Sequence, residues 1–351
     1  MSNFEILRNQ AAKRPILLTG HTGFKGAWMT LLLEAIGIEV VGLSLPPEAD
    51  SLYSLLGRNS KISEYFGDIR SAEFTKSVTA KVRPSAVIHM AAEPLVIESY
   101  AHPERTFETN VMGTVNVLSA ARECDVEIVQ VITTDKVYKN SNMGKRFIED
   151  DPLAGKDPYS ASKVGTETVV SAWKQLYEVS GGTLVHSVRA GNVIGGGDLA
   201  KNRLLPDVIR GLQNSKPVEI RSINSTRPWQ HVLDPLTGYL NALSHNWTTS
   251  KQENFNFGPL EKSLSVGEVL EIIQGQVPHF QWVESKSLNQ TLESARLDLN
   301  SEKSANLLGW KPRLGQEKAV LKTLEWWNLD GHIQRSPIEA CLADIQELVF
   351  P

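Results

Sequence analysis

A tyrosine and a lysine at a fixed spacing are the first residues with a clear chemical use. Tyr159 and Lys163 form a Y-x-x-x-K pattern at the start of an expected helix. Residues at this spacing share one helix face, so the ammonium can lie near the phenol oxygen. A nearby cation stabilises the phenolate and lowers the pKa of the tyrosine toward the working range. The pair predicts a tyrosine base that removes the proton of a substrate hydroxyl.

A second acid and base follow an expected strand at 126–133. Asp135 and Lys136 would emerge at the carboxyl edge of a parallel sheet, where ligands bind in doubly wound folds. A hydroxyl that leaves as water needs a proton donor, and Asp135 suits that role. A C–H proton beside a new ketone needs a base, and Lys136 suits that role. The pair predicts a reaction that goes beyond hydride transfer to the loss of water.

A glycine-rich turn predicts a dinucleotide site. Glycines spaced G-x-x-G-x-x-G lie between an expected strand at 15–19 and an expected helix at 27–36. Such glycines let the backbone approach a pyrophosphate, and the helix N-terminus offers free N–H groups and partial positive charge. The expected cofactor contacts in the turn are Gly20, His21, Thr22, Gly23, Phe24, Lys25 and Gly26.

The residues leave the choice between NAD and NADP open. The second expected strand, at 38–43, leads into Ser44. That position has neither the acidic residue that holds an NAD ribose nor an arginine for a 2′-phosphate. We expect Ser44 to contact the cofactor.

The elements around these motifs predict an α/β fold with a doubly wound parallel, Rossmann-type sheet. Beyond Arg189 the chain becomes rich in glycine and proline, which indicates a smaller, mixed α/β lobe. We expect a dinucleotide-binding domain over residues 1–188 and a substrate-binding lobe over 189–351, with 230–262 partly packing back onto the first domain. The expected strands are 15–19, 38–43, 86–90, 126–133 and 183–188, and the main expected helices are 27–36, 104–122, 160–177, 234–244 and 265–276.

Composition excludes several classes of protein. The chain has 351 residues, of which 22% are charged, and a net charge of −4. This balance is that of a globular protein and argues against a general affinity for nucleic acid or anionic membranes. Its two cysteines form neither a disulfide framework nor a zinc pattern. With no signal peptide or membrane-length apolar run, we expect a cytoplasmic protein without a metal site.

Taken together, the motifs resemble those of the nucleotide-sugar 4,6-dehydratases, in the extended short-chain dehydrogenase/reductase superfamily, and among these the enzymes that act on CDP-glucose. The resemblance runs from about Pro15 to Trp327. Its most specific part is TTDKVY, since dTDP-glucose dehydratases resemble it but carry Glu where Lys136 stands. The motifs are 19–26 (TGHTGFKG), 91–96 (AAEPLV) with Ser99-Tyr100, 109–114 (TNVMGT), 133–138 (TTDKVY), 159–163 (YSASK), 189–198 (RAGNVIGGGD), 227–232 (RPWQHV) and 256–259 (NFGP).

The resemblance implies a reaction cycle with NAD as a regenerated cofactor. Tyr159 would take the proton of the C4 hydroxyl while C4 gives its hydride to NAD, and Thr134 would hydrogen-bond the same oxygen. Lys136 would remove the C5 proton, and Asp135 would protonate the leaving C6 hydroxyl. Return of the hydride to C6 would give a nucleotide-linked 4-keto-6-deoxyhexose.

The resemblance also implies ligand contacts and an assembly. The helices at 104–122 and 160–177 would form a four-helix interface in a homodimer. The implied cofactor contacts are Asp68, Ile69, Ala91, Ala92, Asn110, Thr133, Tyr159 and Lys163, and the implied substrate contacts are Glu93, Asn192, Arg203, Arg221 and Arg227.

Departures from the family pattern concern the substrate more than the chemistry. The family usually has Gln where Glu93 stands, Arg where Ile97 stands, Trp where Leu199 stands and Asp where Asn202 stands. Loss of an arginine and gain of a glutamate would make the pocket less attractive to anions, so a different sugar or nucleotide is an open alternative.

Two other functions remain open at this point. One is a nucleotide-sugar epimerase or another extended reductase of the same fold, which would have no need of Asp135 as an acid for water loss. The other is a non-catalytic dinucleotide-binding sensor, against which the intact Tyr159 and Lys163 argue.

Overall fold

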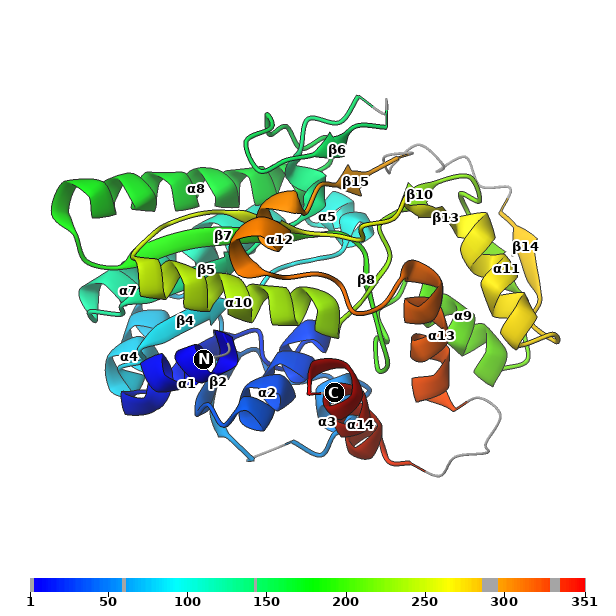
Figure 1. Cartoon of the computed structure of the whole chain (residues 1–351), viewed down its shortest axis with the longest axis horizontal. Helices are drawn as coiled ribbons and strands as arrows, with labels where there is room; N and C mark the ends of the chain where they lie inside the picture. Colours follow the sequence, from blue (N-terminus) through cyan, green and yellow to red (C-terminus); the bar gives the residue numbers. More distant parts are fainter. Residues whose placement is uncertain (1–2, 59–60, 142–143, 286–295, 329–334, 351) are drawn as a thin grey trace.

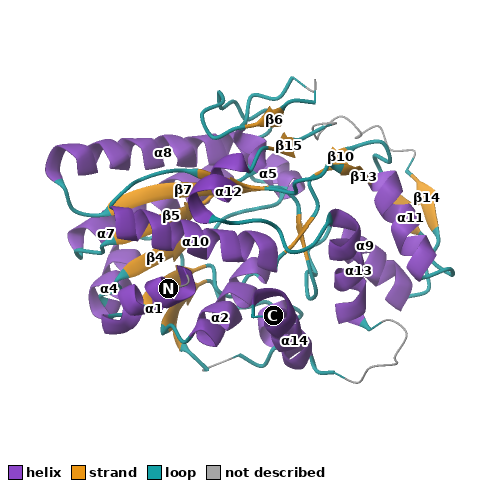
Figure 2. Ribbon diagram, in the orientation of Figure 1, coloured by secondary structure: helices purple, strands orange, loops and turns teal. Residues whose placement is uncertain are grey.

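A parallel β-sheet forms the centre of the larger lobe in the computed structural model, which describes residues 3–58, 61–141, 144–285, 296–328 and 335–350 (Figures 1 and 2). Within these residues the sheet has seven strands in the order β12-β7-β5-β4-β1-β2-β3, and all its neighbours pair in parallel. This order confirms the doubly wound fold. The strands are β1 (Ile16–Thr19), β2 (Val40–Ser44), β3 (Ser63–Phe66), β4 (Ala86–His89), β5 (Ile128–Ile132), β7 (Leu184–Ala190) and β12 (Phe255–Phe257).

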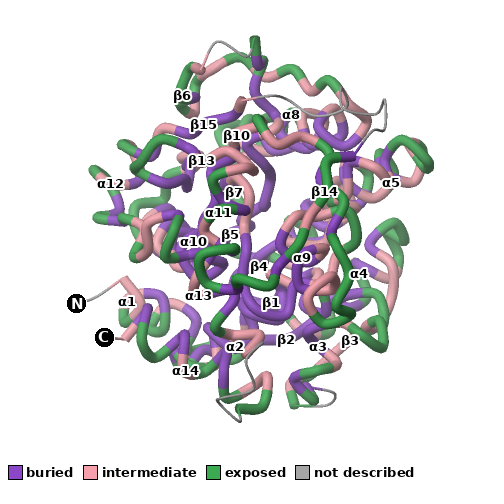
Figure 3. The backbone as a smooth tube through the Cα atoms, turned by 90° about the vertical axis from the view of Figure 1, so that its right-hand side faces the viewer, coloured by how far each residue is buried: buried purple, intermediate pink, exposed green. Residues whose placement is uncertain are grey.

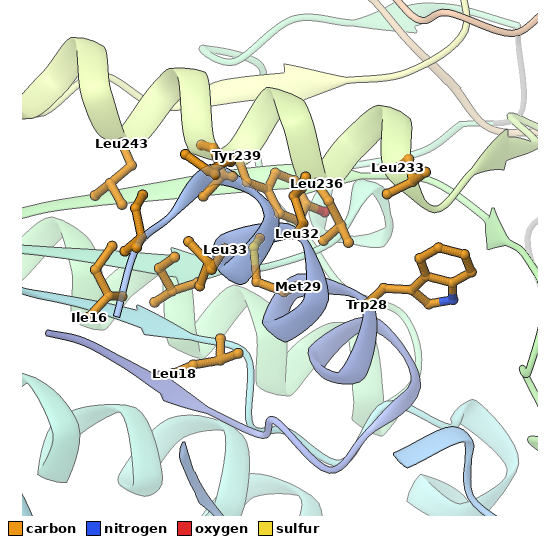
Figure 4. Close-up of a cluster of buried hydrophobic side chains, with 14 of the residues drawn as sticks. Ile16, Leu18, Trp28, Met29, Leu32, Leu33, Leu233, Leu236, Tyr239 and Leu243 are labelled. Atoms are coloured by element: carbon orange, nitrogen blue, oxygen red, sulfur yellow. The ribbon is translucent and has the colours of Figure 1, made fainter. Parts of the chain in front are cut away.

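Alternate residues of the strands feed two separate cores. Ile16 and Leu18 of β1 pack on one face with α2 (Phe24–Ile36) and α10 (Leu233–Thr249), as Figure 4 shows. Leu17, between them, packs on the other face with side chains of α4 (Ala72–Val82), α7 (Gly113–Glu123) and α8 (Pro158–Ser180). Both faces of the sheet are therefore covered, as a parallel sheet requires.

Two strands of the sheet were not expected from the sequence. The edge strand β3 reads Ser-Glu-Tyr-Phe and is only half-buried, so it lacks an apolar run. The opposite edge strand, β12, is short and lies far along the chain, yet its three residues are buried against β7. Edge strands need less apolar sequence than central ones because only one neighbour covers them.

The expected helices form, with one irregularity. Gly37 ends α2 in a left-handed conformation (φ 81°). The helix expected at 104–122 is interrupted: α6 (Pro103–Phe107) passes into a π-helical turn, η2 (Glu108–Met112), and then into α7. Single π-helical turns are rare and are frequent at functional sites.

The smaller lobe has its own hydrophobic core. It lies to the right in Figure 1, and Figure 3 views the molecule from that side, with the central strands of the large sheet buried and much of β14 exposed. Its elements are α9 (Leu204–Gln213), β9 (Val218–Ile220), α11 (Val266–Gln276), β14 (Trp282–Glu284) and α13 (Gln316–Trp327).

Several segments beyond residue 189 pack against the first lobe. α10 contacts α1 (Asn3–Gln10) and α2, and β12 joins the large sheet. α12 (Glu302–Leu308) packs on α10, and the last helix, α14 (Pro337–Val349), packs on α2. The division at residues 188 and 189 stays a prediction, but the structure shows that the chain returns to the first lobe more than once.

None of the described helices is long and apolar enough to cross a membrane.

Short elements connect the parts of the fold. The remaining elements are α1 (Asn3–Gln10), η1 (Ala11–Lys13), α3 (Leu52–Leu55), α5 (Val96–Ala101), η3 (Asp135–Val137), β6 (Arg146–Phe147), β8 (Val193–Ile194), β10 (Thr226–Arg227), β11 (Gln230–His231), β13 (Leu264–Ser265) and β15 (Asp298–Leu299).

Candidate active site

The acid–base segment Thr134–Lys136 lies directly after β5, at the carboxyl edge of the sheet. Asp135 begins the short 3-10 turn η3, and Thr134 caps it by accepting a hydrogen bond from the backbone N–H of Lys136 (3.3 Å). The Thr134 hydroxyl donates to Oδ1 of Asp135 (3.0 Å). The turn therefore orients the carboxyl of Asp135 from both its own backbone and its neighbour.

The first turn of α8 positions Tyr159. Asp157 and Ser160 form a capping box, with Pro158 at the first helical position, so the helix begins at a defined residue. The Tyr159 backbone N–H donates to Oγ of Ser99 in α5 (3.1 Å), and Oγ of Ser162 donates to the Tyr159 carbonyl (2.7 Å). Ser99 belongs to a motif of the family resemblance, and its positioning role here was not expected.

The two candidate pairs converge on one place. Nζ of Lys136 lies 6.0 Å from the centroid of the Tyr159 ring. Nζ of Lys163 donates to the carbonyl of Ile132, the last residue of β5 (3.1 Å). The helix that carries Tyr159 and Lys163 is thus attached to the strand that leads into Asp135.

Burial shifts the pKa values of both Tyr159 and Lys163. It raises the pKa of Tyr159 to about 12, against the opposing effect of a hydrogen bond with Thr134. It also lowers the pKa of Lys163 to about 8, while the charge of Glu167 works in the other direction. The expected lowering of the tyrosine pKa is therefore wrong for the protein chain alone, because desolvation outweighs it and the Lys163 ammonium is directed at a backbone carbonyl.

Asp135 has the properties of a proton donor. Burial raises the pKa of its carboxyl to about 6, although Lys136, Thr134 and Arg227 oppose the shift. A Cβ at Gly191 would come within 3.1 Å of Oδ2 of Asp135 and would overlap Pro228, so only glycine lets these groups close around the carboxyl. A carboxyl with a raised pKa holds its proton closer to neutral pH, as an acid catalyst must.

A pocket opens beside this acid–base segment. It holds about 460 Å³ of space, part of it open to solvent. Asn192 and Arg227, both expected substrate contacts, line it together with Asp135 and Lys136. The rest of the lining comes mainly from the loop between β5 and α8: Tyr138, Asn140, Ala154, Lys156, Asp157, Ser160 and Leu297. Of these, Tyr138 and Ser160 belong to motifs of the family resemblance, and sequence reasoning did not single out the others.

The other expected substrate residues lie outside this lining. Arg203 pairs with Asp198 (3.2 Å), and Nη2 of Arg221 donates to the carbonyl of Asn202 (3.2 Å). The carboxylate of Glu93 lies 3.4 Å from Nη2 of Arg105. Among the described residues, the pocket therefore brings together two of the five expected substrate contacts.

Two glycines of the turn are required by the fold, and the third faces open space. Gly20 has a φ of 75°, and a Cβ there would lie 2.7 Å from the backbone nitrogen of Ala91. A Cβ at Gly26 would overlap the carbonyl of Gly20. At Gly23, which is exposed and precedes α2, a Cβ would have only one neighbour, at 3.4 Å. A phosphate approaching the N-terminus of α2 would find room at Gly23.

The side chains of His21, Thr22 and Phe24 in the glycine-rich turn each contact a different part of the protein. The buried ring of His21 lies 3.2 Å from a carboxylate oxygen of Glu64. Oγ1 of Thr22 is 2.7 Å from Oγ of Ser44. Phe24 packs against the main core.

The side chain of Lys25 lies close enough to Lys163 and Asp135 to be affected by their charges. Its Nζ donates to the hydroxyl of Tyr239 (3.3 Å). Burial, with the charges of Lys163 and Arg203, lowers the pKa of Lys25 to about 7. An amine in this place adds a group near the acid–base segment that the glycine spacing alone did not predict.

The remaining expected cofactor residues differ in where their groups point. Asp68 accepts three hydrogen bonds from Arg70, which lower the pKa of its carboxyl although burial works in the other direction. Ile69 is buried in the core of the second face. The Thr133 hydroxyl donates to Glu167 (2.5 Å). Ala91 follows β4 and donates its backbone N–H to Thr19 (3.2 Å), and Ala92 is its neighbour.

Asn110 acts within the protein. From the π-helical turn, its side-chain oxygen accepts the N–H of Glu93 (2.8 Å), and its amide nitrogen donates to the carbonyl of Glu93 (3.1 Å) and to Oγ of Ser162 (2.8 Å). It thereby joins the loop after β4 to the catalytic helix α8. Over the part of the chain that the structure describes, no group of three or more His, Cys, Asp or Glu is arranged to hold a metal ion.

Known proteins with the same fold and similar sequences place this geometry in a family. The chain is 39% identical to the CDP-glucose 4,6-dehydratase of Salmonella typhimurium, over 89% of each chain. It superposes on a UDP-glucose 4-epimerase of Thermus thermophilus with a TM-score of 0.78, at 24% identity, over 91% of this chain and 100% of that one. The dTDP-glucose 4,6-dehydratase DesIV of Streptomyces venezuelae gives a TM-score of 0.77, at 24% identity, over 89% and 96% of the two chains.

A family model matches the part of the chain that carries the glycine turn, the acid–base segment and the tyrosine–lysine pair, over residues 16–258. The chain belongs to the NAD-dependent epimerase/dehydratase family.

Proposed function

We propose that the chain is a nucleotide-sugar 4,6-dehydratase that binds NAD and converts CDP-glucose to the CDP-linked 4-keto-6-deoxy sugar. The observation that carries this proposal is the acid–base segment: Lys136 lies 6.0 Å from the ring of Tyr159, beside an Asp135 carboxyl whose pKa is raised to about 6. The 39% identity to a CDP-glucose 4,6-dehydratase supports the same reaction and the same nucleotide.

The residues present fit a dinucleotide. Gly20 and Gly26 hold a tight turn, and Gly23 leaves space before the N-terminus of α2. No side chain of the N-cap residue Gly23 caps this helix end, so its backbone N–H groups can bind a pyrophosphate. When bound there, NAD would supply a hydride acceptor for C4 and a hydride donor for C6. Ser44 is the last residue of β2 and Asp68 follows β3, at the same edge of the sheet, where an adenosine would extend.

The protein groups divide the work between them. Tyr159, with Thr134 on its phenol, would take the proton of the C4 hydroxyl. Lys136 would take the C5 proton, which a C4 ketone makes acidic, and Asp135 would give its proton to the departing C6 hydroxyl. Lys163 would hold a positive charge beside the phenol and toward the cofactor.

The pocket suits a diphosphate next to a sugar. Arg227 and Lys156 contribute positive charge and Asn192 contributes an amide, all beside Asp135 and Lys136. Arg203 and Arg221 are secondary candidates, since both lie outside the lining. Glu93 would affect the substrate indirectly, because Arg105 balances its charge.

An epimerase is the second candidate, favoured only by the likeness of fold to the Thermus thermophilus enzyme. The deciding experiment uses a panel of nucleotide-hexoses, each labelled with deuterium at C4 of the sugar, and includes CDP-glucose. Each is incubated separately with the protein, and the position of the label in the product is determined. A dehydratase forms a product lighter by one water and moves the label to C6 of the same molecule. Label that returns to C4 indicates an epimerase, and the absence of turnover indicates a binding protein.

We also propose that the protein is a cytoplasmic homodimer. Exposed apolar side chains on α6, η2 and α8, among them Phe107, Met112, Leu176 and Val179, support a subunit contact through these helices. Two free cysteines fit a reducing compartment. Mass measurement in solution tests the dimer, and a charged substitution at Met112 should reduce the mass to that of one chain.

A further inference from the structure

A buried ion pair lies beneath the acid–base segment and joins α8 to β7. Nε of Arg189 is 2.7 Å from Oε1 of Glu167, and Nη2 donates to Oε2 (2.8 Å). Each of the two side chains is only 3% exposed. Glu167 is on the same helix as Tyr159 and Lys163. The three residues are spaced four apart, so they lie along one face of α8. A pair this deeply buried must have all its hydrogen-bonding groups satisfied to persist.

The remaining groups of the pair hold both ends of the acid–base segment. On one side, the Thr133 hydroxyl donates to Oε1 of Glu167 (2.5 Å). On the other, Nη1 of Arg189 donates to the hydroxyl of Tyr138 (2.8 Å). Thr133 and Tyr138 flank Thr134–Lys136 in the sequence, so these two side-chain attachments, one on each side of the segment, lead to one ion pair.

The attachment at Tyr138 extends to the edge of the sheet. The Tyr138 hydroxyl donates to Oδ1 of Asn256 in β12 (2.7 Å), and its ring stacks on Phe147 (centroids 4.9 Å apart, planes at 4°). Arg189 also donates to the carbonyl of Glu149 (2.8 Å). The ion pair is therefore a junction between α8, β7, β12 and the loop that follows the acid–base segment.

We infer that the Glu167–Arg189 pair is a positioning unit that holds Asp135 and Lys136 in place relative to Tyr159 and Lys163. The inference rests on the proposed function, in which these groups act on three consecutive carbons, C4, C5 and C6, of one sugar. Tyr159 and Lys163 belong to α8, whereas Asp135 and Lys136 belong to the turn after β5. Glu167 is part of α8, and the ion pair contacts Thr133 and Tyr138, the residues on either side of the acid–base segment. Displacement of a reacting group by about 1 Å can lower a rate about a hundredfold.

Two substitutions separate positioning from general support of the core. Thr133→Val removes the hydroxyl that attaches the acid–base segment to Glu167. Ser187→Ala removes another buried hydroxyl that donates to the same carboxylate (2.8 Å), but from β7. Both lose one hydrogen bond to Glu167, but only the first removes a side-chain attachment of the segment that carries Asp135 and Lys136. The other side-chain attachment, from Tyr138 to Arg189, remains in both variants. Thr133→Ser keeps the hydroxyl and serves as the rescue.

The measurement is a rapid-quench single turnover of CDP-glucose on protein saturated with NAD. Mass spectrometry then compares the 4-keto sugar, which has lost two hydrogens and keeps its C6 hydroxyl, with all sugar that has lost water, either the unsaturated intermediate or the final 4-keto-6-deoxy product. We expect Thr133→Val to slow water loss about tenfold to a hundredfold, so that the 4-keto sugar with its C6 hydroxyl accumulates. The first oxidation should change much less. Ser187→Ala and Thr133→Ser should keep the wild-type ratio of the 4-keto sugar to the sugar that has lost water.

Melting temperature and NAD affinity, measured for each variant, separate positioning from loss of stability or of cofactor. Equal accumulation in Thr133→Val and Ser187→Ala, or a Thr133→Val variant that slows both steps alike, would overturn the inference. As a control, the wild-type protein is assayed under the same conditions with CDP-glucose that carries deuterium at C4. Label transfer to C6 in wild type establishes the function on which the variants are judged, and its absence rejects both the function and this inference.

Discussion

The turn after β1 and the segment after β5 lie at the same edge of the sheet but are built in opposite ways. The turn depends on backbone shape: Gly20 and Gly26 are required because a Cβ at either position would overlap backbone atoms. The acid–base segment depends on side chains, since Asp135 is held by Thr134 and its flanks by Glu167 and Arg189. A backbone site is readable from local sequence, whereas a side-chain site needs partners that are distant in sequence.

The largest expected effect is on the side-chain site. Tyr159→Phe removes the phenol that takes the C4 proton and should lower turnover about 10²- to 10⁴-fold. NAD affinity should stay near wild type, because the backbone site is intact. Steady-state rates and cofactor titration check both. Turnover within a few-fold of wild type would remove Tyr159 from its proposed role.

The next effect depends on pH. Burial raises the pKa of Asp135 to about 6, so the carboxyl keeps its proton up to about that pH. Since the protonated form is the acid, water loss should be fastest below about pH 6 and fall about tenfold for each unit above it. Asp135→Asn should remove this limb and slow water loss about 10²-fold or more, with near-ultraviolet absorbance of reduced nicotinamide building up. A pH profile unchanged in Asp135→Asn would assign the acid elsewhere.

A third pair of variants compares the glycines within the turn. Gly26→Ala should destabilise the fold by about 1–3 kcal/mol, because its Cβ would overlap the Gly20 carbonyl. Gly23→Asp has room for a side chain and should leave the melting temperature nearly unchanged. Its carboxylate should repel a pyrophosphate and weaken NAD binding about tenfold or more. Calorimetric melting and cofactor titration measure the two effects, and undiminished affinity in Gly23→Asp would move the pyrophosphate elsewhere.

The smallest expected effect tests how Tyr159 is held. Ser99→Ala removes the acceptor of the Tyr159 backbone N–H. One such hydrogen bond contributes about 1 kcal/mol, so we expect a loss of turnover of about fivefold with an unchanged KM. Ser99→Thr, which keeps a hydroxyl, should recover part of the rate. A change confined to KM would indicate that Ser99 acts on substrate binding instead.

Much of the fold could be predicted from local patterns, and the failures have physical causes. β1, β4 and β5 are buried on both faces and read as apolar runs, whereas β3 is a half-buried edge strand without one. The π-helical turn left no periodic trace, because the apolar pattern continues through it. The short strand β12 gains its place from β7 and α10 rather than from its own sequence.

The candidate site shows the same limit. Spacing was enough to propose Tyr159, Lys163, Asp135 and Lys136, and the structure brings them together. Their environment was not predictable, since the raised pKa of Tyr159 results from burial. Residues of the pocket such as Asn140 and Leu297 come from separate loops, and no short motif joins them.

Because of the π-helical turn at Glu108–Met112, the number of residues in this segment determines how α6 is oriented relative to α7. Each residue turns an α-helix by about 100°, so the extra residue that a π turn accommodates sets how α6 is rotated relative to α7. With it, Asn110 reaches Glu93 and Ser162 while Val117 remains in the core. A deletion of one residue here would turn Asn110 away and reorient the apolar Phe107. Insertions and deletions, which surface loops tolerate, would at this point disturb the active site and the proposed subunit contact together.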